Sequence, residues 1–110
     1  MAVALNTFKT ITAVLTTDLT TIYTAPANYT GIVLMAQIAN VSTSAVPTTA
    51  GLYNGSTFTE LISEYFIPAN DSVSVTQGKL VLESGFTFEA SASVNSSCKI
   101  ILSVLETANG

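Results

Sequence analysis

The chain has 110 residues, of which 48% are hydrophobic and only 9% are charged. Seven acidic residues oppose three lysines, Arg, His and Trp are absent, and the formal net charge is −4. This length supports one domain with a single core. An acidic chain without arginine has no electrostatic basis for holding nucleic-acid phosphates or an anionic membrane surface, so neither nucleic acid nor membrane is expected as a partner.

The low charge fraction is the most informative feature of the composition. Soluble domains carry about 25% charged residues, and this chain carries little more than a third of that share. Seventeen Thr and twelve Ser supply an uncharged polar surface, while the mean hydropathy is positive. We therefore expect other protein chains to cover part of the apolar surface, in a homo-oligomer or a larger assembly.

The pattern of strand-forming residues and turns is typical of an all-β fold. Thr, Val, Ile, Tyr and Phe are prominent, and turn signals recur about every eight to fifteen residues, which predicts an antiparallel sandwich of seven or eight strands. The first two strands are expected at residues 8–15 and 19–25. Residues 1–7 are expected to form an N-terminal arm, and residues 107–110 a loose tail.

The third predicted strand, residues 30–40, is apolar on both faces, so it is either a central strand covered twice or an interface strand. Regular alternation places Ile32, Leu34, Ala36 and Ile38 on one face and Val33, Met35, Gln37 and Ala39 on the other. We assign Leu34 to the core and name Val33 and Met35 as candidate interface residues. Residues 99–106 show the same two-sided pattern, and there the candidates are Ile101 and Leu105.

The middle of the chain combines loops, a hairpin and one ambiguous segment. Residues 41–50 are expected to be a loop, and Asn54-Gly55 a two-residue hairpin turn with an exposed tip. The apolar residues of segment 57–66 fit helical spacing as well as a strand with a bulge, and the neighbouring β signals favour the strand. The further predicted strands are residues 72–76, 79–83 and 86–93.

Catalytic and metal-binding patterns are weak. Without His, a Ser or Cys nucleophile lacks its usual partner, so Cys98 is interpreted as a small buried hydrophobe. The Ser96-x-x-Lys99 spacing and the pair Glu60 and Glu64 are interpreted as ordinary surface chemistry. We therefore expect no enzymatic activity, no cofactor and no metal site.

Two stretches of turn and strand carry a family resemblance. They are Leu19-Thr-Thr-Ile-Tyr-Thr-Ala-Pro-Ala-Asn28 running into Ile32-Val-Leu-Met-Ala-Gln-Ile-Ala-Asn40, and Ile67-Pro-Ala-Asn70 followed by Gly78-Lys-Leu-Val-Leu-Glu-Ser-Gly85. The chain resembles small virion structural proteins of tailed bacteriophages, including those that infect cyanobacteria and other aquatic hosts. The resemblance implies a small β-sandwich of the particle, either a capsid cement or decoration subunit or a component of the tail. It transfers no catalytic residue.

The leading interpretation is a non-enzymatic capsid cement protein, a single jelly-roll-like sandwich over residues 1–110. We expect it in the virion, bound to the major capsid protein or other virion proteins. It is expected to be made in the host cytoplasm, because the N-terminus lacks the basic region of a signal peptide. The local symmetry of icosahedral shells predicts a homotrimer. The alternatives are a tail or neck subunit, and a tail-fibre tip that binds a host glycan through exposed loop residues Tyr29, Tyr53 and Asn54.

Overall fold

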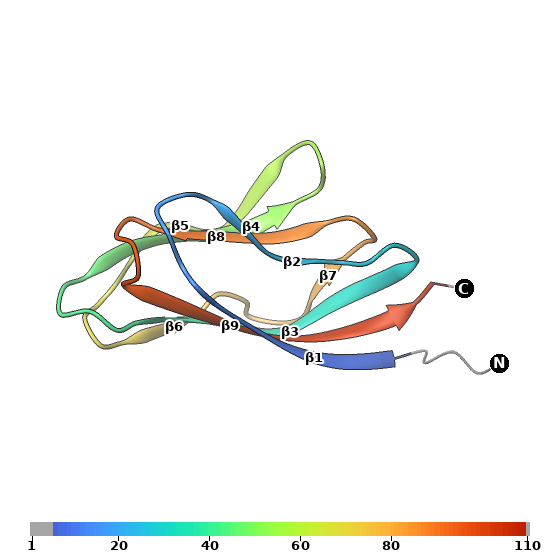
Figure 1. Cartoon of the computed structure of the whole chain (residues 1–110), viewed down its shortest axis with the longest axis horizontal. Coiled ribbons are helices and arrows are strands. Elements are labelled where there is room, and N and C mark those ends of the chain that lie inside the picture. The colour runs from blue at the N-terminus through green and yellow to red at the C-terminus, as the bar shows by residue number, and fades with distance from the viewer. Residues whose placement is uncertain (1–5, 110) are drawn as a thin grey trace.

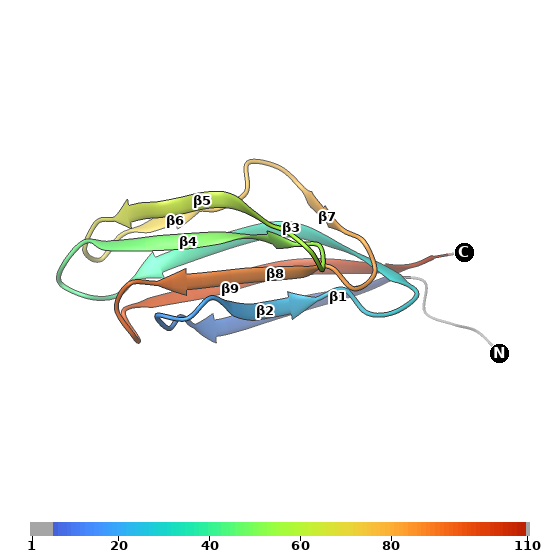
Figure 2. The same ribbon diagram turned by 90° about the horizontal axis from the view of Figure 1, so that it is seen from above.

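Two antiparallel β-sheets pack face to face in the computed structural model, which describes residues 6–109 (Figure 1, Figure 2). Sheet A contains, in spatial order, β1 (Asn6–Val14), β9 (Cys98–Ala108) and β3 (Tyr29–Asn40), and then an edge made by β6 (Ser72–Ser74) and β7 (Leu80–Leu82). Sheet B contains, in spatial order, β2 (Thr20–Thr24), β8 (Thr87–Ala92), β4 (Val46–Tyr53) and β5 (Phe58–Ile67). Among residues 6–109 there is no helix long and apolar enough to cross a bilayer.

The strand order is that of a jelly roll. β6 pairs with residues 37–39 of β3 and β7 with residues 31–33, so these two short strands share one edge position, which residues 75–79 interrupt. With that edge counted once, each sheet has four strand positions, and successive strands alternate between the sheets except at the β4–β5 hairpin, in the order of two nested Greek keys. The predicted all-β, jelly-roll-like sandwich is confirmed. Residues 6–109 form nine strands instead of seven or eight because one edge strand is split.

β4 begins inside the segment predicted to be a loop. Val46, Thr48 and Ala50 alternate toward the core and are buried, so the pattern of a half-buried strand is present. Pro47 is tolerated in this strand because it precedes Thr48, the first residue of β4 that pairs with β8.

The hairpin after β4 forms as predicted, with a longer loop. Residues 54–57 make a four-residue connection in which the Asn54 side-chain oxygen accepts hydrogen bonds from the backbone N–H groups of Ser56 and Thr57. Gly55 has a φ of 95°, which favours glycine. The tip is exposed, as expected, and Figure 1 shows this end of the hairpin rising away from the sandwich.

Both predicted flexible ends take part in the fold where the structure describes them. Asn6 and Thr7, assigned to the arm, begin β1, and residues 1–5 lie outside the described residues. Thr107 and Ala108, assigned to a loose tail, extend β9 along β3. The Asn109 side-chain oxygen accepts a 2.6 Å hydrogen bond from Thr30, and its amide donates to Ser84. These bonds hold the segment that the prediction left free.

A β-bulge in β3 decides which of its side chains reach the core. Val33 pairs with Val104 and Met35 with Ser103, so Leu34 is an extra residue. Val33 is fully buried, whereas Leu34 and Met35 are both half-buried. The assignment of Val33 to an interface and of Leu34 to the core was therefore wrong, because regular alternation does not continue across the bulge.

A buried ionic cluster ties the two sheets together. The Tyr23 hydroxyl, in sheet B, donates a 2.6 Å hydrogen bond to the Glu106 carboxylate in sheet A, and the Lys9 ammonium lies 3.1 Å from the other carboxylate oxygen. Glu106 is 5% exposed. Gly31 makes room for this phenol, since a Cβ there would lie 2.8 Å from the Tyr23 oxygen. The partners satisfy a carboxylate whose burial would otherwise be destabilising.

The structure confirms the prediction that Cys98 is a small buried hydrophobe. Cys98 begins β9 as a free, fully buried thiol. Burial raises its pKa, with a smaller opposing effect from a hydrogen bond to Ser97. A buried thiol with a raised pKa is a packing residue and a poor nucleophile.

Our first prediction tests the bulge in β3. We expect Val33→Ala to lower the free energy of unfolding by about 2 kcal/mol, and Leu34→Ala to lower it by less, although Leu34 is the larger side chain. Urea denaturation of the two variants would measure the order. The opposite order would contradict the placement of Val33 in the core.

Our second prediction concerns the ionic cluster. Tyr23→Phe should lower the free energy of unfolding at pH 7 by about 1.5–3 kcal/mol, because Glu106 loses a charge-assisted hydrogen bond. Burial first, and the Glu106 bond second, raise the pKa of Tyr23 above its ordinary value of 10.0.

The raised pKa of Tyr23 also gives a pH dependence. The unfolded chain releases this proton at a lower pH than the folded chain, so Tyr23 contributes a loss of stability as the pH rises above about 10, and Tyr23→Phe should lack that contribution. Urea denaturation of the wild type and of Tyr23→Phe, at pH 7 and above about pH 10, would test this, with Tyr53→Phe as the control. A loss below about 0.5 kcal/mol at pH 7 would argue against the cluster's role.

Candidate functional site

The outer face of sheet A carries a row of apolar side chains across all its strand positions. Phe8 of β1 lies opposite Leu105 of β9, Leu105 lies opposite Ile32 of β3, and Ile32 lies opposite Val81 of β7. Phe8 is 74% exposed and Val81 55% exposed, at the two ends of the row. Because facing side chains in neighbouring strands touch, the row is one continuous apolar strip.

Farther along the strands the same face is mixed and hollowed. Ile101 lies between Thr12 and Gln37, and Lys99 lies between Val14 and Ala39. Ile101 and Lys99 both line two hollows, one of about 380 Å³ toward β1 and one of about 350 Å³ toward β6. A third hollow, of about 310 Å³, lies over Ser103 and is lined by Phe8 and Leu34. The face therefore has both protruding apolar side chains and apolar hollows.

Among the strand positions of sheet A that point outward between residues 6 and 109, Lys99 is the charged residue. The other outward side chains of β1, β9, β3, β6 and β7 are apolar, hydroxyl or amide groups. Lys9 lines the hollow over Ser103, and Asp71 lines a hollow beside Ala39 and Ser72, so further charged groups lie at the margins of the face. A row of strand positions with one cation and no carboxylate is unusual for a protein surface in contact with water.

The outer face of sheet B is acidic at its centre. Glu89 of β8 accepts hydrogen bonds from the hydroxyls of Thr21 and Thr87. The neighbouring position on β4 is Gly51, and beyond it lies Glu60 of β5. Toward the ends of β5 the same face carries aromatic side chains, since Phe66 is 63% exposed and Phe58 pairs with Tyr53. The two outer faces therefore differ in charge at their centres, although both carry apolar groups.

The predicted interface residues divide between this face and the core. Ile101 and Leu105 point outward, as the unbroken alternation of β9 implies, and Met35 lies half-buried beside the bulge. Val33 is in the core. Sequence reasoning did not identify Phe8, Ile32 and Val81, because their alignment depends on the register between strands. The alternation of Phe8 and Val14 with inward Ile11 and Ala13 was the available signal in β1.

The structure does not gather the predicted loop contacts into one site. Tyr29 begins β3 in sheet A and Tyr53 ends β4 in sheet B, and both are half-buried. Asn54 is exposed, but its side-chain oxygen is engaged within the hairpin loop. Their role in binding a ligand stays a prediction.

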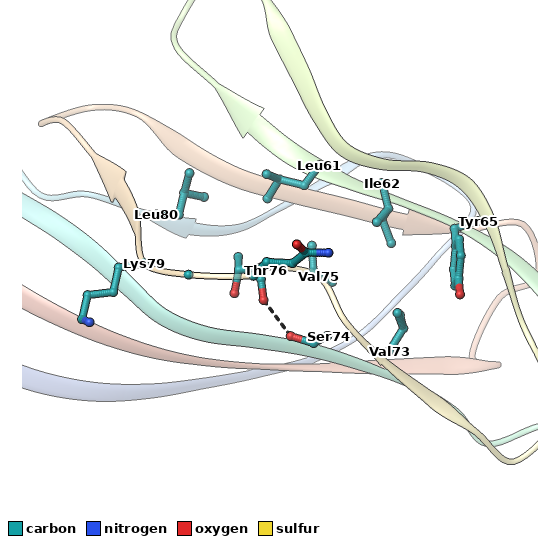
Figure 3. A pocket seen from close by; sticks show the side chains of 11 residues that line it. Leu61, Ile62, Tyr65, Val73, Ser74, Val75, Thr76, Lys79 and Leu80 are labelled. Carbon is teal, nitrogen blue, oxygen red and sulfur yellow. Dashed lines mark hydrogen bonds between the residues drawn. The ribbon is translucent and has the colours of Figure 1, made fainter.

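A groove of about 460 Å³ lies along the flank where β5 faces the edge formed by β6 and β7 (Figure 3). Two bulges in β5, on either side of Ile62, change its alternation, because Tyr65, Ile62 and Glu60 pair with Thr48, Ala50 and Gly51. As a result Leu61, Ile62 and Tyr65 all line the groove, opposite Val73 and Leu80. The groove is an apolar recess with a polar rim.

Comparison with known proteins relates the fold to bacteriophage capsids. A chain in the "Acidic stable capsid structure of Helicobacter pylori bacteriophage KHP30" matches 97% of this chain and 90% of its own length, with a TM-score of 0.57 and 11% identity. A pentameric capsid protein from metagenomic phage sequences, present in two crystal structures, matches 91% of this chain with a TM-score of 0.47 and 18% identity. This chain covers 62% and 63% of that protein in the two structures. No protein-family model and no curated protein matches the sequence.

Our third prediction tests the two faces of β3. Met35→Asp should leave a folded chain, because Met35 lies on the outer side of sheet A, whereas Val33→Asp should unfold it by burying an unpaired charge. Circular dichroism combined with gel filtration would distinguish these results. An unfolded Met35→Asp variant would contradict the outward placement.

Proposed function

We propose that the chain is a non-enzymatic structural protein of a phage virion, and specifically a cement or decoration protein that binds the capsid. The observation that carries the proposal is the contrast between its two outer faces. An apolar strip crosses sheet A, while the centre of sheet B presents acidic and hydroxyl groups, with aromatic side chains such as Phe66 toward the ends of β5. A subunit with one apolar and one polar face is suited to lie on a protein surface with its other side in water.

The fold comparison supports this proposal. The chain matched in the KHP30 capsid is similar in length to this one, since the match covers 97% of this chain and 90% of that one. The bridging of neighbouring capsomers by a cement protein would bury additional area and oppose the pressure of packaged DNA.

The proposed assembly is a homotrimer bound to the major capsid protein. The local threefold axes of an icosahedral shell provide sites where three copies would be held together. Closed rings are the usual result when copies of one chain associate head to tail.

Our fourth prediction is the copy number in the particle. Quantitative mass spectrometry of purified particles should find this chain in numbers comparable to the major capsid protein, because cement proteins occupy repeated sites of the shell. A dozen copies or fewer would instead place it in the tail or neck. Absence from the particle would overturn the proposal.

A further inference from the structure

We infer that the outer face of sheet A is the surface that binds the capsid, and that its partner is an apolar surface carrying a carboxylate for Lys99. This inference rests on the proposed function and adds to it the orientation of the subunit and the chemistry of its partner. It follows from the charge, the area and the relief of this face.

The charge of the face argues against a twofold pair of sheet A faces as the occupant. In a twofold pair of sheet A faces, both copies contribute the same surface. Over the strand positions Lys99 would meet either the other Lys99 or uncharged groups, since no outward strand position of sheet A between residues 6 and 109 carries a carboxylate, and Asp71 lies beyond the end of β6. Covering a lysine without a carboxylate is unfavourable. A different chain with an acidic residue removes that penalty and also determines the orientation of docking.

The area of the face leads to the same conclusion. Four strand positions about 4.8 Å apart, over the eleven residues of β9 at about 3.3 Å each, give a footprint of roughly 700 Å². Stable pairs bury about 800 Å² on each partner. The face alone is therefore slightly smaller than the surface that an independent dimer buries. It is sufficient for a subunit held at several points of a larger shell, where the contacts act together.

The shape of the face indicates the shape of the partner's surface. Ile101 and Lys99 lie between two hollows, one lined by Thr12 and Val14 and the other by Gln37, Ala39 and Val41. Two apolar projections of the partner on either side of Ile101 would fill them, with a carboxylate reaching Lys99 between them. This is the arrangement of an interface core with one oriented ion pair.

Our fifth prediction is tested by photo-crosslinking in assembled particles. A benzophenone amino acid would replace Ile101 on the sheet A face in one variant, and Thr49, which faces outward from sheet B, in another. We expect cross-links to a different virion protein from position 101 and none from position 49. Cross-links from position 101 that join two copies of this chain, or none at all from that position, would overturn the inference, as would shell cross-links from position 49 alone.

Charge variants test the partner's carboxylate. We expect Lys99→Glu to reduce the number of copies per particle about tenfold, and Lys99→Arg to keep it within about twofold because the charge is preserved. Lys79→Glu, an equal charge change at a lysine that lines the groove on the flank, is the matched control. Ile101→Glu should act like Lys99→Glu, whereas Val94→Glu, at a comparably exposed site in the β8–β9 connection, should not. Unchanged incorporation of Lys99→Glu, or an equal loss in Lys79→Glu, would contradict the inferred ion pair.

The wild-type copy number separates the two hypotheses. If the wild-type chain is abundant in particles but cross-links through another surface, the inference about sheet A fails and the cement function stands. If the chain is absent from particles, the proposed function itself fails.

Discussion

One extra residue in β3 determines how the rest of the sandwich is arranged. Because Leu34 is inserted between residues paired with Val104 and Ser103, Val33 points into the core on one side of the bulge and Ala36 and Ile38 do so on the other. β3 lies between β9 and the split β6/β7 edge, so its phase determines which side of sheet A is packed and which is left outward. On the N-terminal side of the bulge this alternation points Ile32 outward, where it continues the apolar strip.

Much of the fold could be predicted from composition, alternation and turn residues, because these are local signals. Ile101 and Leu105 lie on the face opposite the core residues of β9, as its uninterrupted alternation indicated, and their role in an interface stays a prediction. The prediction placed Leu34 in the core and Val33 at an interface, whereas Val33 is the core residue. The error arose because the sequence of an apolar strand does not reveal where a bulge lies. The strip from Phe8 to Val81 depends on the register of four strands, and such pairings between distant segments are not encoded within any one of them.

The ambiguous segment in β5 shows how a bulge can imitate another element. Its apolar residues occur at spacings of one and three, which favour a helix face. The chain is a strand in which two bulges bring Leu61, Ile62 and Tyr65 to the same side. Glu64, beside one bulge, has a φ of 46°, a conformation that side-chain-bearing residues seldom adopt. A helical spacing inside a β-rich sequence can thus indicate a strand with two bulges.

Lys9 protects the β1 edge of sheet A against pairing with another chain. β1 is a nine-residue edge strand, and an open edge of that length is a template for sheet extension and aggregation. Lys9 stands on the core side of that edge, held by Glu106, and an incoming strand would have to cover this ammonium. The opposite edge of sheet A is divided into two three-residue pieces. Extension of sheet A is therefore disfavoured at both of its edges, and copies of this chain are kept from joining edge to edge through that sheet.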